Sequence, residues 1–149
     1  MPHDRSARQI TLKQTFPGQL DSLAAIGDLV TEAAHAADLD ARDVYGIQLA
    51  VDEACSNIIQ HAYNGERQGP IECICQVSDK GLSVTIRDRG EPFDPSSVPE
   101  PDLESDLEER DIGGLGVYFI HQMTDEVHFD CTAEGGNEVT LIKRRRKDA

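Results

Sequence analysis

Residues 51–63 read VDEACSNIIQHAY and complete a helical pattern that begins about ten residues earlier. At about 100° per residue, six apolar positions of this pattern fall on one stripe of the helix. These positions are Val44, Ile47, Val51, Cys55, Ile58 and Ala62. Glu53, Asn57 and His61 are spaced four residues apart and line a second stripe beside the first. The segment therefore predicts an amphipathic helix that presents polar groups next to the core.

Glu53 and Asn57 place a carboxylate and an amide one helical turn apart. A carboxylate accepts a proton from an attacking hydroxyl and an amide oxygen holds Mg²⁺, so the pair suits phosphoryl transfer. Gly46 and Ala50 share this side, and their small size leaves space for a ligand to approach. The alternative is a solvated glutamate beside an incidental asparagine. Asparagine costs a helix roughly half a kcal/mol against alanine, which favours a role for Asn57 without proving one.

The rest of the chain supplies strands and helices on both sides of this helix. Alternation and turn residues predict the following order of elements. A strand at 8–15, with Ile10 and Leu12 on one face, is followed by a break at Pro17-Gly18. A helix at 19–37 and a second helix, from an N-cap at Asp40 to about Tyr63, come next. The remaining elements are a hairpin of strands 71–77 and 82–87 with its turn at 78–81, a long loop at 89–113, a short helix at 114–123, and strands at 126–131 and 137–143. This order predicts an α+β fold, a two-layer sandwich whose mixed, mostly antiparallel sheet carries helices on one face.

A second cluster occurs at residues 84–94, which read VTIRDRGEPFD. An alternating strand ends at Asp88, and Gly90 frees the backbone just after it. A carboxylate held at the end of a sheet can accept a hydrogen bond from the exocyclic amine of adenine, whereas the guanine carbonyl would be rejected. An ordinary D-x-G turn is the equal alternative.

A third cluster, residues 111–120, reads DIGGLGVYFI. Glycines that open a helix let backbone amides reach phosphate oxygens, and the helix dipole favours negative charge there. The pattern lacks the preceding strand and the spaced third glycine of a dinucleotide fingerprint, and the chain contains no Gly-Lys-Ser/Thr of a P-loop. A flexible helix entry explains the glycines equally well when they are taken alone.

Length and charge narrow the classes of function. The chain has 149 residues, which fits a single domain, and a net charge of −14, which opposes binding to the phosphate backbone of nucleic acids. No apolar run approaches the roughly 20 residues of a membrane span, and the polar start predicts no signal peptide, so we expect a cytoplasmic protein. Four cysteines without zinc-ligand spacing indicate buried, reduced thiols, and the basic run 143–147 indicates a solvated tail.

Together, the three clusters resemble the N, G1 and G2 boxes of the GHKL superfamily of ATPases and kinases. Within that superfamily, the chain resembles the bacterial anti-sigma factor serine/threonine kinases, over about residues 10–143. The matching segments are Asp52-Glu53-Ala54 with Asn57 and His61-Ala62-Tyr63, Asp88-Arg89-Gly90 with Phe93-Asp94, Gly113 to Ile120, and Met123-Thr124-Asp125-Glu126-Val127. The resemblance implies a Bergerat-type ATP-binding fold forming one domain, 1–149, with a core at about 8–143 and an ATP lid at about 95–112.

The resemblance also assigns roles to single residues. It implies that Glu53 is the general base, that Asn57 binds Mg²⁺ and the nucleotide, and that Asp88 binds adenine beside Gly90. The remaining nucleotide contacts it implies are the phosphate-binding residues Gly114, Leu115 and Gly116. His61 either lines the site or packs against the lid, and Arg89 and Arg110 either offset phosphate charge or are solvated. One departure is that Gly136 is followed by Asn137 where other GHKL proteins often carry Gly-Thr, which leaves nucleotide contacts from this segment open.

The implied function is a serine/threonine kinase that uses ATP and Mg²⁺ to phosphorylate an anti-sigma factor antagonist of the STAS type. Such a protein also sequesters a sigma factor, and the resemblance implies a homodimer. The antagonist and the sigma factor compete for it in partner switching, which regulates transcription without direct contact to nucleic acid. A nucleotide-binding switch module without catalysis and a detached histidine-kinase catalytic domain are the alternatives. The acidic stretch 100–109 would be unfavourable beside a triphosphate, so we expect it to stay open or to face a partner.

Overall fold

The computed structural model describes residues 9–62, 69–91, 120–132 and 136–146. Its elements occur in the order that the sequence predicts. They are β1 (Ile10–Pro17), α1 (Ser22–Ala36), α2 (Ala41–Asn57), the π-helix η2 (Ile58–Ala62), β2 (Pro70–Ser78), β3 (Gly81–Asp88), β4 (Glu126–Cys131) and β5 (Asn137–Arg144). Residues 120–123 form a helical segment, and the rest of the helix expected at 114–123 lies outside the described residues.

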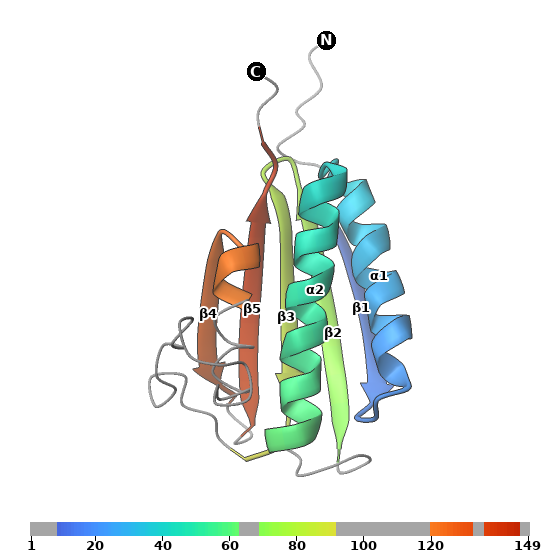
Figure 1. Ribbon diagram of the computed structural model, residues 1–149, viewed down its shortest axis with the longest axis vertical. Coiled ribbons are helices and arrows are strands. Elements are labelled where there is room, and N and C mark those ends of the chain that lie inside the picture. The colour runs from blue at the N-terminus through green and yellow to red at the C-terminus, as the bar shows by residue number, and fades with distance from the viewer. Residues whose placement is uncertain (1–8, 63–68, 92–119, 133–135, 147–149) are drawn as a thin grey trace, which may run out of the picture.

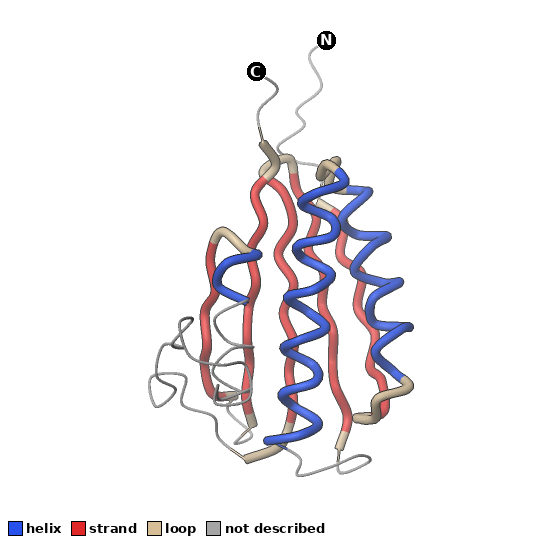
Figure 2. The backbone as a smooth tube through the Cα atoms, in the orientation of Figure 1, coloured by secondary structure: helices blue, strands red, loops and turns tan. Residues whose placement is uncertain are grey.

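The five strands form one sheet in the order β1-β2-β3-β5-β4. Each described pair of neighbouring strands is antiparallel. Helices α1 and α2 lie side by side on one face of this sheet, and the other face carries no described helix (Figures 1 and 2). The expected α+β sandwich with a mostly antiparallel sheet is therefore confirmed. Within the described ranges, no helix has both the length and the apolar character needed to cross a membrane.

The core lies between the helices and the sheet, as the strand alternation requires. Every second residue of β2 and β3 is buried on the helix side, from Ile71 to Val77 and from Leu82 to Asp88. The apolar stripe of α2 packs against these buried side chains. Its buried members are Val44, Ile47, Val51, Cys55 and Ile58, as the sequence predicts.

Local hydrogen bonds determine where the N-terminal ends of α1 and α2 lie. Asp40 is the N-cap of α2, because its Oδ1 accepts a hydrogen bond of 2.8 Å from the Asp43 amide, as predicted. Helix α1 begins at Ser22 rather than at Gln19. The Ser22 amide donates to the Gln19 carbonyl (2.9 Å) and its hydroxyl to the Pro17 carbonyl (2.7 Å), so the intervening residues form a turn.

The second helix departs from the prediction at its C-terminal end. The α-helix was expected to continue to about Tyr63, but it ends at Asn57 and continues as the wider η2. Ile58 and Ile59 are both buried, so two consecutive β-branched side chains enter the core where the helix widens. A 3.6-residue period does not bring neighbouring residues to the same side, whereas a π turn adds a residue and shifts the phase.

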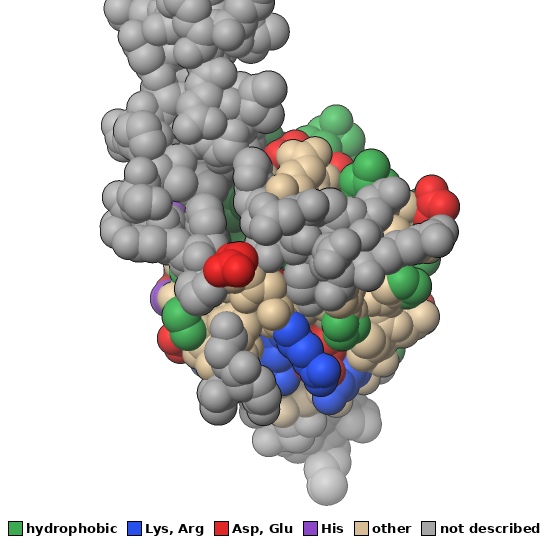
Figure 3. Space-filling view, turned by 90° about the horizontal axis from the view of Figure 1, so that it is seen from below, with side chains coloured by type: hydrophobic (Ala, Val, Ile, Leu, Met, Phe, Trp, Pro, Cys, Tyr) green, Lys and Arg blue, Asp and Glu red, His purple; other side chains and the backbone are tan. Residues whose placement is uncertain are grey.

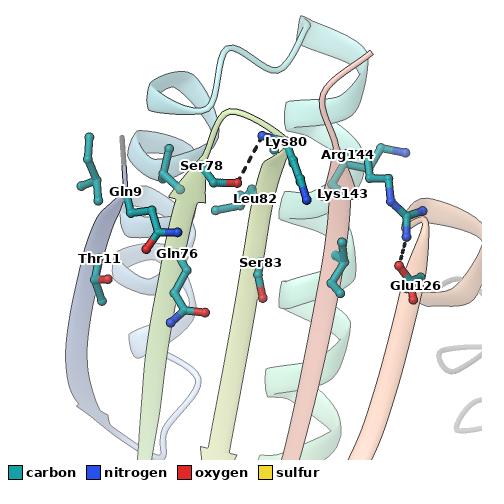
Figure 4. Close-up of a pocket in the computed structure, with 14 residues that line it drawn as sticks. Gln9, Thr11, Gln76, Ser78, Lys80, Leu82, Ser83, Glu126, Lys143 and Arg144 are labelled. Atoms are coloured by element: carbon teal, nitrogen blue, oxygen red, sulfur yellow. Dashed lines mark hydrogen bonds and ion pairs between the residues drawn. The ribbon is translucent and has the colours of Figure 1, made fainter. Parts of the chain in front are cut away.

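The turn between β2 and β3 lies where the sequence predicts it, at residues 78–81. Gly81 has φ of 139°, and a Cβ there would lie 2.3 Å from the Lys143 carbonyl oxygen. The Ser78 hydroxyl accepts a hydrogen bond from the Lys80 amide (3.2 Å), which closes the turn (Figure 4). Glycine is therefore required at residue 81 by both conformation and space.

Three of the four cysteines are buried, as expected, and Cys131 is exposed, which corrects the expectation for that residue. Cys131 lies on the outermost strand β4, where it is not covered by the helices. The Cys73 and Cys75 sulfurs are 3.9 Å apart on the helix face of β2. Burial raises the pKa of the Cys55 thiol well above its usual range, so this thiol stays protonated. The described residues contain no cluster of potential metal ligands.

The basic C-terminal run is not simply a solvated tail. Lys143 belongs to β5 and is buried, and its Nζ lies 3.4 Å from Oδ1 of the buried Asp43. Arg146 donates from Nε to Oδ2 of the same carboxylate at 3.1 Å. The expectation of a solvated tail was wrong because these pairs join residues about a hundred positions apart in the sequence. They attach the start of α2 to the end of the sheet.

We expect Asp43→Asn to lower the free energy of unfolding by about 3 kcal/mol, because it leaves the Lys143 ammonium buried without its nearest carboxylate. The control is Glu126→Gln, which breaks the partly exposed ion pair with Arg144 and should cost under about 1 kcal/mol. Urea unfolding of both variants measures the difference. Equal losses in the two variants would contradict the role given to Asp43.

Candidate nucleotide-binding site

The predicted site residues that the structure describes lie around one end of the sheet. At the lower end in Figure 1, β3 ends at Asp88, β5 begins at Asn137, and the C-terminal half of α2 covers them. Asp88 and Asn137 are opposite each other in the antiparallel register. Both therefore project from the helix-covered face, so the end of the core is polar at this point.

Asp88 is buried, with 4% of its surface exposed. Its Oδ1 accepts two hydrogen bonds, from the Gly90 amide at 2.8 Å and from Asn137 Nδ2 at 3.0 Å. Burial raises the pKa of Asp88 above its usual value, and the hydrogen bonds from Asn137 and Gly90 oppose that rise. The carboxylate is thus desolvated and held in one orientation.

Asn137 is the site residue whose contact the sequence left open. Its Nδ2 donates to Asp88 Oδ1 and also to the Glu91 carbonyl, the latter at 2.7 Å. The signal that could have found it is the strand register. Asp88 ends one core strand and Asn137 begins another, so antiparallel pairing of the two predicts that their side chains meet.

Gly136 brings the turn before β5 against the backbone of β3. A Cβ on Gly136 would lie 1.9 Å from the Asp88 carbonyl oxygen and 2.8 Å from the Arg89 Cα. The Gly136 amide donates to the Thr132 hydroxyl at 2.9 Å, which fixes this approach. Residue 136 must therefore be glycine for Asn137 to reach Asp88.

Glu53 and Asn57 are half-buried and lie on one flank of α2. The direction of this flank is shown by Gly46, which shares it by helical phase and whose added Cβ would lie 3.3 Å from the Met123 carbonyl oxygen. Asp52 faces the other way, since it lines a groove between α2 and α1. The structure therefore turns Glu53 and Asn57 towards the side of α2 on which Met123 packs, away from α1.

Several predicted residues lie outside the described part of the chain. They are Phe93, Asp94, Arg110, Gly113, Gly114, Leu115 and Gly116, together with the expected lid at 95–112. The backbone of His61 belongs to η2, and its side chain is not described. The site described here is accordingly the base-binding and helix-borne part of the predicted one.

Basic side chains gather on the open face at the same end of the sheet (Figure 3). Lys13, Arg87 and Arg89 line a cavity of about 290 Å³ there, with Asp88 at its edge. Arg87 pairs with Glu138 (2.8 Å) and Glu72 (3.1 Å), so its charge is largely compensated on that face. Arg89 is exposed next to Asp88 at this end of the sheet, and its role as a phosphate counter-charge stays a prediction.

A cavity of about 520 Å³ occurs at the opposite end of the sheet, near the β2–β3 turn (Figure 4). It is lined mainly by polar side chains such as Gln76, Ser83 and Arg144, and Arg144 pairs with Glu126 at its edge. None of the predicted site residues lines it. Its size alone does not make it the site, because it lies at the other end of the sheet from Asp88 and Asn137.

The fold fits the GHKL class: an antiparallel sheet is covered by helices on one face, and a buried carboxylate at a strand end lies beside the helix that carries Glu53 and Asn57. The family model for the histidine kinase-like ATPase domain matches residues 16–143. The chain belongs to this family.

Relatives with assigned activities include the serine-protein kinase RsbW of Bacillus velezensis, 34% identical over 90 residues, which are 57% of this chain and 56% of that protein. The same kinase of Bacillus licheniformis is 30% identical over 105 residues, covering 68% of this chain and 64% of that protein. The chain thus matches somewhat less than two thirds of the length of these relatives. A crystal structure of the RsbU and RsbW domains of a Mycobacterium tuberculosis protein superposes with a TM-score of 0.64 at 17% identity, over 93% of this chain and 33% of that one. This likeness confirms the fold.

We expect Asp88→Asn to raise the melting temperature of the free protein at pH 7. Burial raises the pKa of Asp88 in the folded state. As the pH rises above about 4, Asp88 therefore ionises in the unfolded chain before it ionises in the folded protein. Between the unfolded and the folded pKa, the folded state loses stability relative to the unfolded state. The variant keeps an oxygen acceptor but carries no charge. Thermal melts between pH 3 and pH 8 should show its advantage appearing above about pH 4 and levelling off above the raised pKa.

The control is Asp28→Asn, an exposed residue of α1, which should show no comparable trend. A difference between wild type and Asp88→Asn that stays constant across this pH range would contradict the interpretation.

Proposed function

We propose that this protein binds ATP with Mg²⁺ and transfers the γ-phosphoryl group to a serine or threonine of a protein partner. The observation that carries the proposal is the buried Asp88, held by Asn137 and Gly90 at the end of the sheet that is covered by the C-terminal half of α2, the helix that bears Glu53 and Asn57. The names of the kinase relatives support the reaction class.

Asp88 supplies base recognition in this proposal. Its buried carboxylate accepts a hydrogen bond from the exocyclic amine of adenine, and the hydrogen bonds on Oδ1 orient it for that contact. Guanine presents a carbonyl oxygen at the same position. Two acceptors would then face each other without a proton in a buried place, which rejects the wrong base strongly.

Glu53 is the general base. The oxygen of a serine or threonine hydroxyl attacks the γ-phosphorus, the bond to the β–γ bridging oxygen breaks, and ADP leaves with that electron pair. The hydroxyl proton passes to the Glu53 carboxylate. Asn57, one turn further along α2, offers an amide oxygen of the kind Mg²⁺ accepts, and the metal neutralises phosphate charge when it is bound. Gly114, Leu115 and Gly116 bring backbone amides to the phosphates.

The partners follow from the family resemblance and the surface charge. A net charge of −14 disfavours nucleic acid as a partner, and the names of the serine-protein kinase relatives support a protein acceptor. We propose an anti-sigma factor antagonist of the STAS type as the phosphorylated partner and a sigma factor as the sequestered one, with the kinase acting as a homodimer in the cytoplasm. The domain is proposed to extend over 1–149, with the lid at about 95–112.

Nucleotide binding is tested by the melting temperature with ATP, ADP and GTP, each with and without Mg²⁺. A nucleotide at 100 times its dissociation constant adds about 2.7 kcal/mol, which corresponds to several degrees in a domain of this size. We expect adenine nucleotides to raise the melting temperature, GTP to leave it unchanged, and Asp88→Asn to respond to none. If no nucleotide shifts the wild type at saturation, the proposal fails.

Catalysis is tested by Glu53→Gln, assayed for phosphate transfer from labelled ATP to the STAS-type antagonist of the same organism. Transfer should fall at least 100-fold while ATP still raises the melting temperature, because only proton acceptance is lost. Asp52→Asn is the matched control. Asp52 lines the groove between α2 and α1, so this variant should keep the phosphate-transfer activity. Equal rates in Glu53→Gln and wild type would remove Glu53 from the mechanism and favour a module that only binds nucleotide.

A further inference from the structure

We propose that Gly46 is a positioning residue for phosphoryl transfer, because the absence of a side chain there sets the spacing between α2 and residues 120–124. That spacing fixes where the Glu53 carboxylate lies relative to the phosphates. The inference rests on the proposed function, since it assumes that Glu53 accepts the proton of the attacking hydroxyl. It adds a residue that acts through the helix rather than by a functional group of its own.

Helices α1 and α2 each have one glycine in their interior, and the two glycines differ in what faces them. Glycine destabilises a helix interior relative to alanine, because it has more conformational freedom to lose. A Cβ on Gly27 of α1 would lie 3.6 Å from Gln48 Nε2, the end of a flexible side chain, which is an ordinary contact. A Cβ on Gly46 of α2 would lie 3.3 Å from the Met123 carbonyl oxygen, a backbone atom. At Gly46, an added methyl group therefore forces a shift of a few tenths of an ångström.

The segment that faces Gly46 is held in place by the core and by hydrogen bonds. Ile120 is 1% exposed and belongs to the hydrophobic core. The buried Thr124 hydroxyl donates to the Ile120 carbonyl at 2.8 Å, and the Asp125 amide donates to the Ile142 carbonyl of β5, also at 2.8 Å. The segment therefore does not yield freely to a methyl group on Gly46, and part of the displacement passes to α2.

Gly46 and Glu53 lie on the same flank of α2. Their separation in the sequence is almost two helical turns, or about 10 Å along the axis, and the helical hydrogen bonds make α2 stiff over this length. A displacement at Gly46 is therefore transmitted to Glu53. On the other side of the contact, Gly116 shortly precedes Ile120 in the sequence, and the proposed function assigns a phosphate contact to Gly116. The contact at Gly46 thus joins the helix that carries the base to the segment that follows the phosphate-binding glycines.

The expected effect is on the rate of the chemical step rather than on nucleotide binding. A misplacement of about 1 Å at the reacting groups can cost roughly 100-fold in rate, so a shift of a few tenths of an ångström should cost several-fold. The stability of the folded protein should change little. Alanine favours the helix, and crowding against the Met123 carbonyl opposes that gain.

The test is the steady-state kinetics of phosphate transfer from ATP to the STAS-type antagonist of the same organism, with wild type and Gly46→Ala. We expect kcat to fall about 5- to 20-fold while KM for ATP stays within about threefold. The melting temperature should stay within about 2 °C, and ATP should raise it equally in both proteins. Every protein is assayed well below the lowest melting temperature of the set, and rates are expressed per folded protein as measured by circular dichroism.

The matched control is Gly27→Ala, the same substitution in the interior of α1. Alanine there favours the helix without meeting a backbone atom, so the melting temperature should rise by about 2–4 °C. The kcat of this variant should equal that of the wild type. The comparison separates the effect of the contact at Gly46 from the effect of an alanine in a helix.

Three results would overturn the inference. A Gly46→Ala variant that is more stable and fully active, like Gly27→Ala, would show that the spacing has no effect on transfer. A higher KM for ATP at unchanged kcat would place Gly46 in nucleotide binding instead. A loss of kcat together with a large fall in melting temperature would reduce Gly46 to a packing residue. In each case the proposed function stands, because the wild type still transfers phosphate; if the wild type transfers none, the proposed function fails together with the inference.

Discussion

The burial of the α2 stripe against the sheet is the interaction on which the site depends. Val51 and Cys55 are almost completely buried between the helix and the sheet, and these contacts fix the rotation of α2 about its axis. Because each residue turns the helix by about 100°, fixing the apolar stripe also fixes the flank with Glu53 and Asn57. Gly46 permits the close approach of residue 123 on that flank, since a side chain there would press on the Met123 carbonyl. The packing of the core thus sets the direction of the polar side chains on this flank of the helix.

The strand register fixes the direction of the Asp88 and Asn137 side chains in a similar way. Asp88 and Asn137 are paired across β3 and β5, and every second pair beyond them places Ile86, Val84 and Leu82 on the helix side. A slip of one residue would bring these apolar side chains to the open face and Asp88 with them. The free energy of burying the alternate residues of β3, of the order of 1.5–3 kcal/mol for each large aliphatic side chain, therefore also holds the carboxylate in place.

The features that sequence predicts here are those that arise locally or from periodicity. The Asp40 cap, the Gly81 turn and the alternation of β3 that ends at Asp88 depend on neighbouring residues, and each was found. The pairing of Lys143 with Asp43 and the contacts of Asn137 join distant segments, and no local pattern encodes them. The π-helix that follows Asn57 is likewise not encoded by a local pattern. It results from burial of consecutive isoleucines against a sheet whose position only the fold defines.

Neutral donors suit the role that we propose for the Asp88 carboxylate better than a cation would. Burial raises its pKa, and an arginine beside it would reverse that shift, but a guanidinium binds both carboxylate oxygens in parallel. The nearby Arg87 instead projects to the open face and is engaged by Glu138 and Glu72. The amides of Gly90 and Asn137 share Oδ1 and compensate part of the desolvation. In the proposed function, the amine of the base would donate a further hydrogen bond to this buried carboxylate and offset more of its desolvation. Under the proposed function, burial of Asp88 would couple base recognition to folding stability, since a ligand that completes its hydrogen bonds stabilises the folded state.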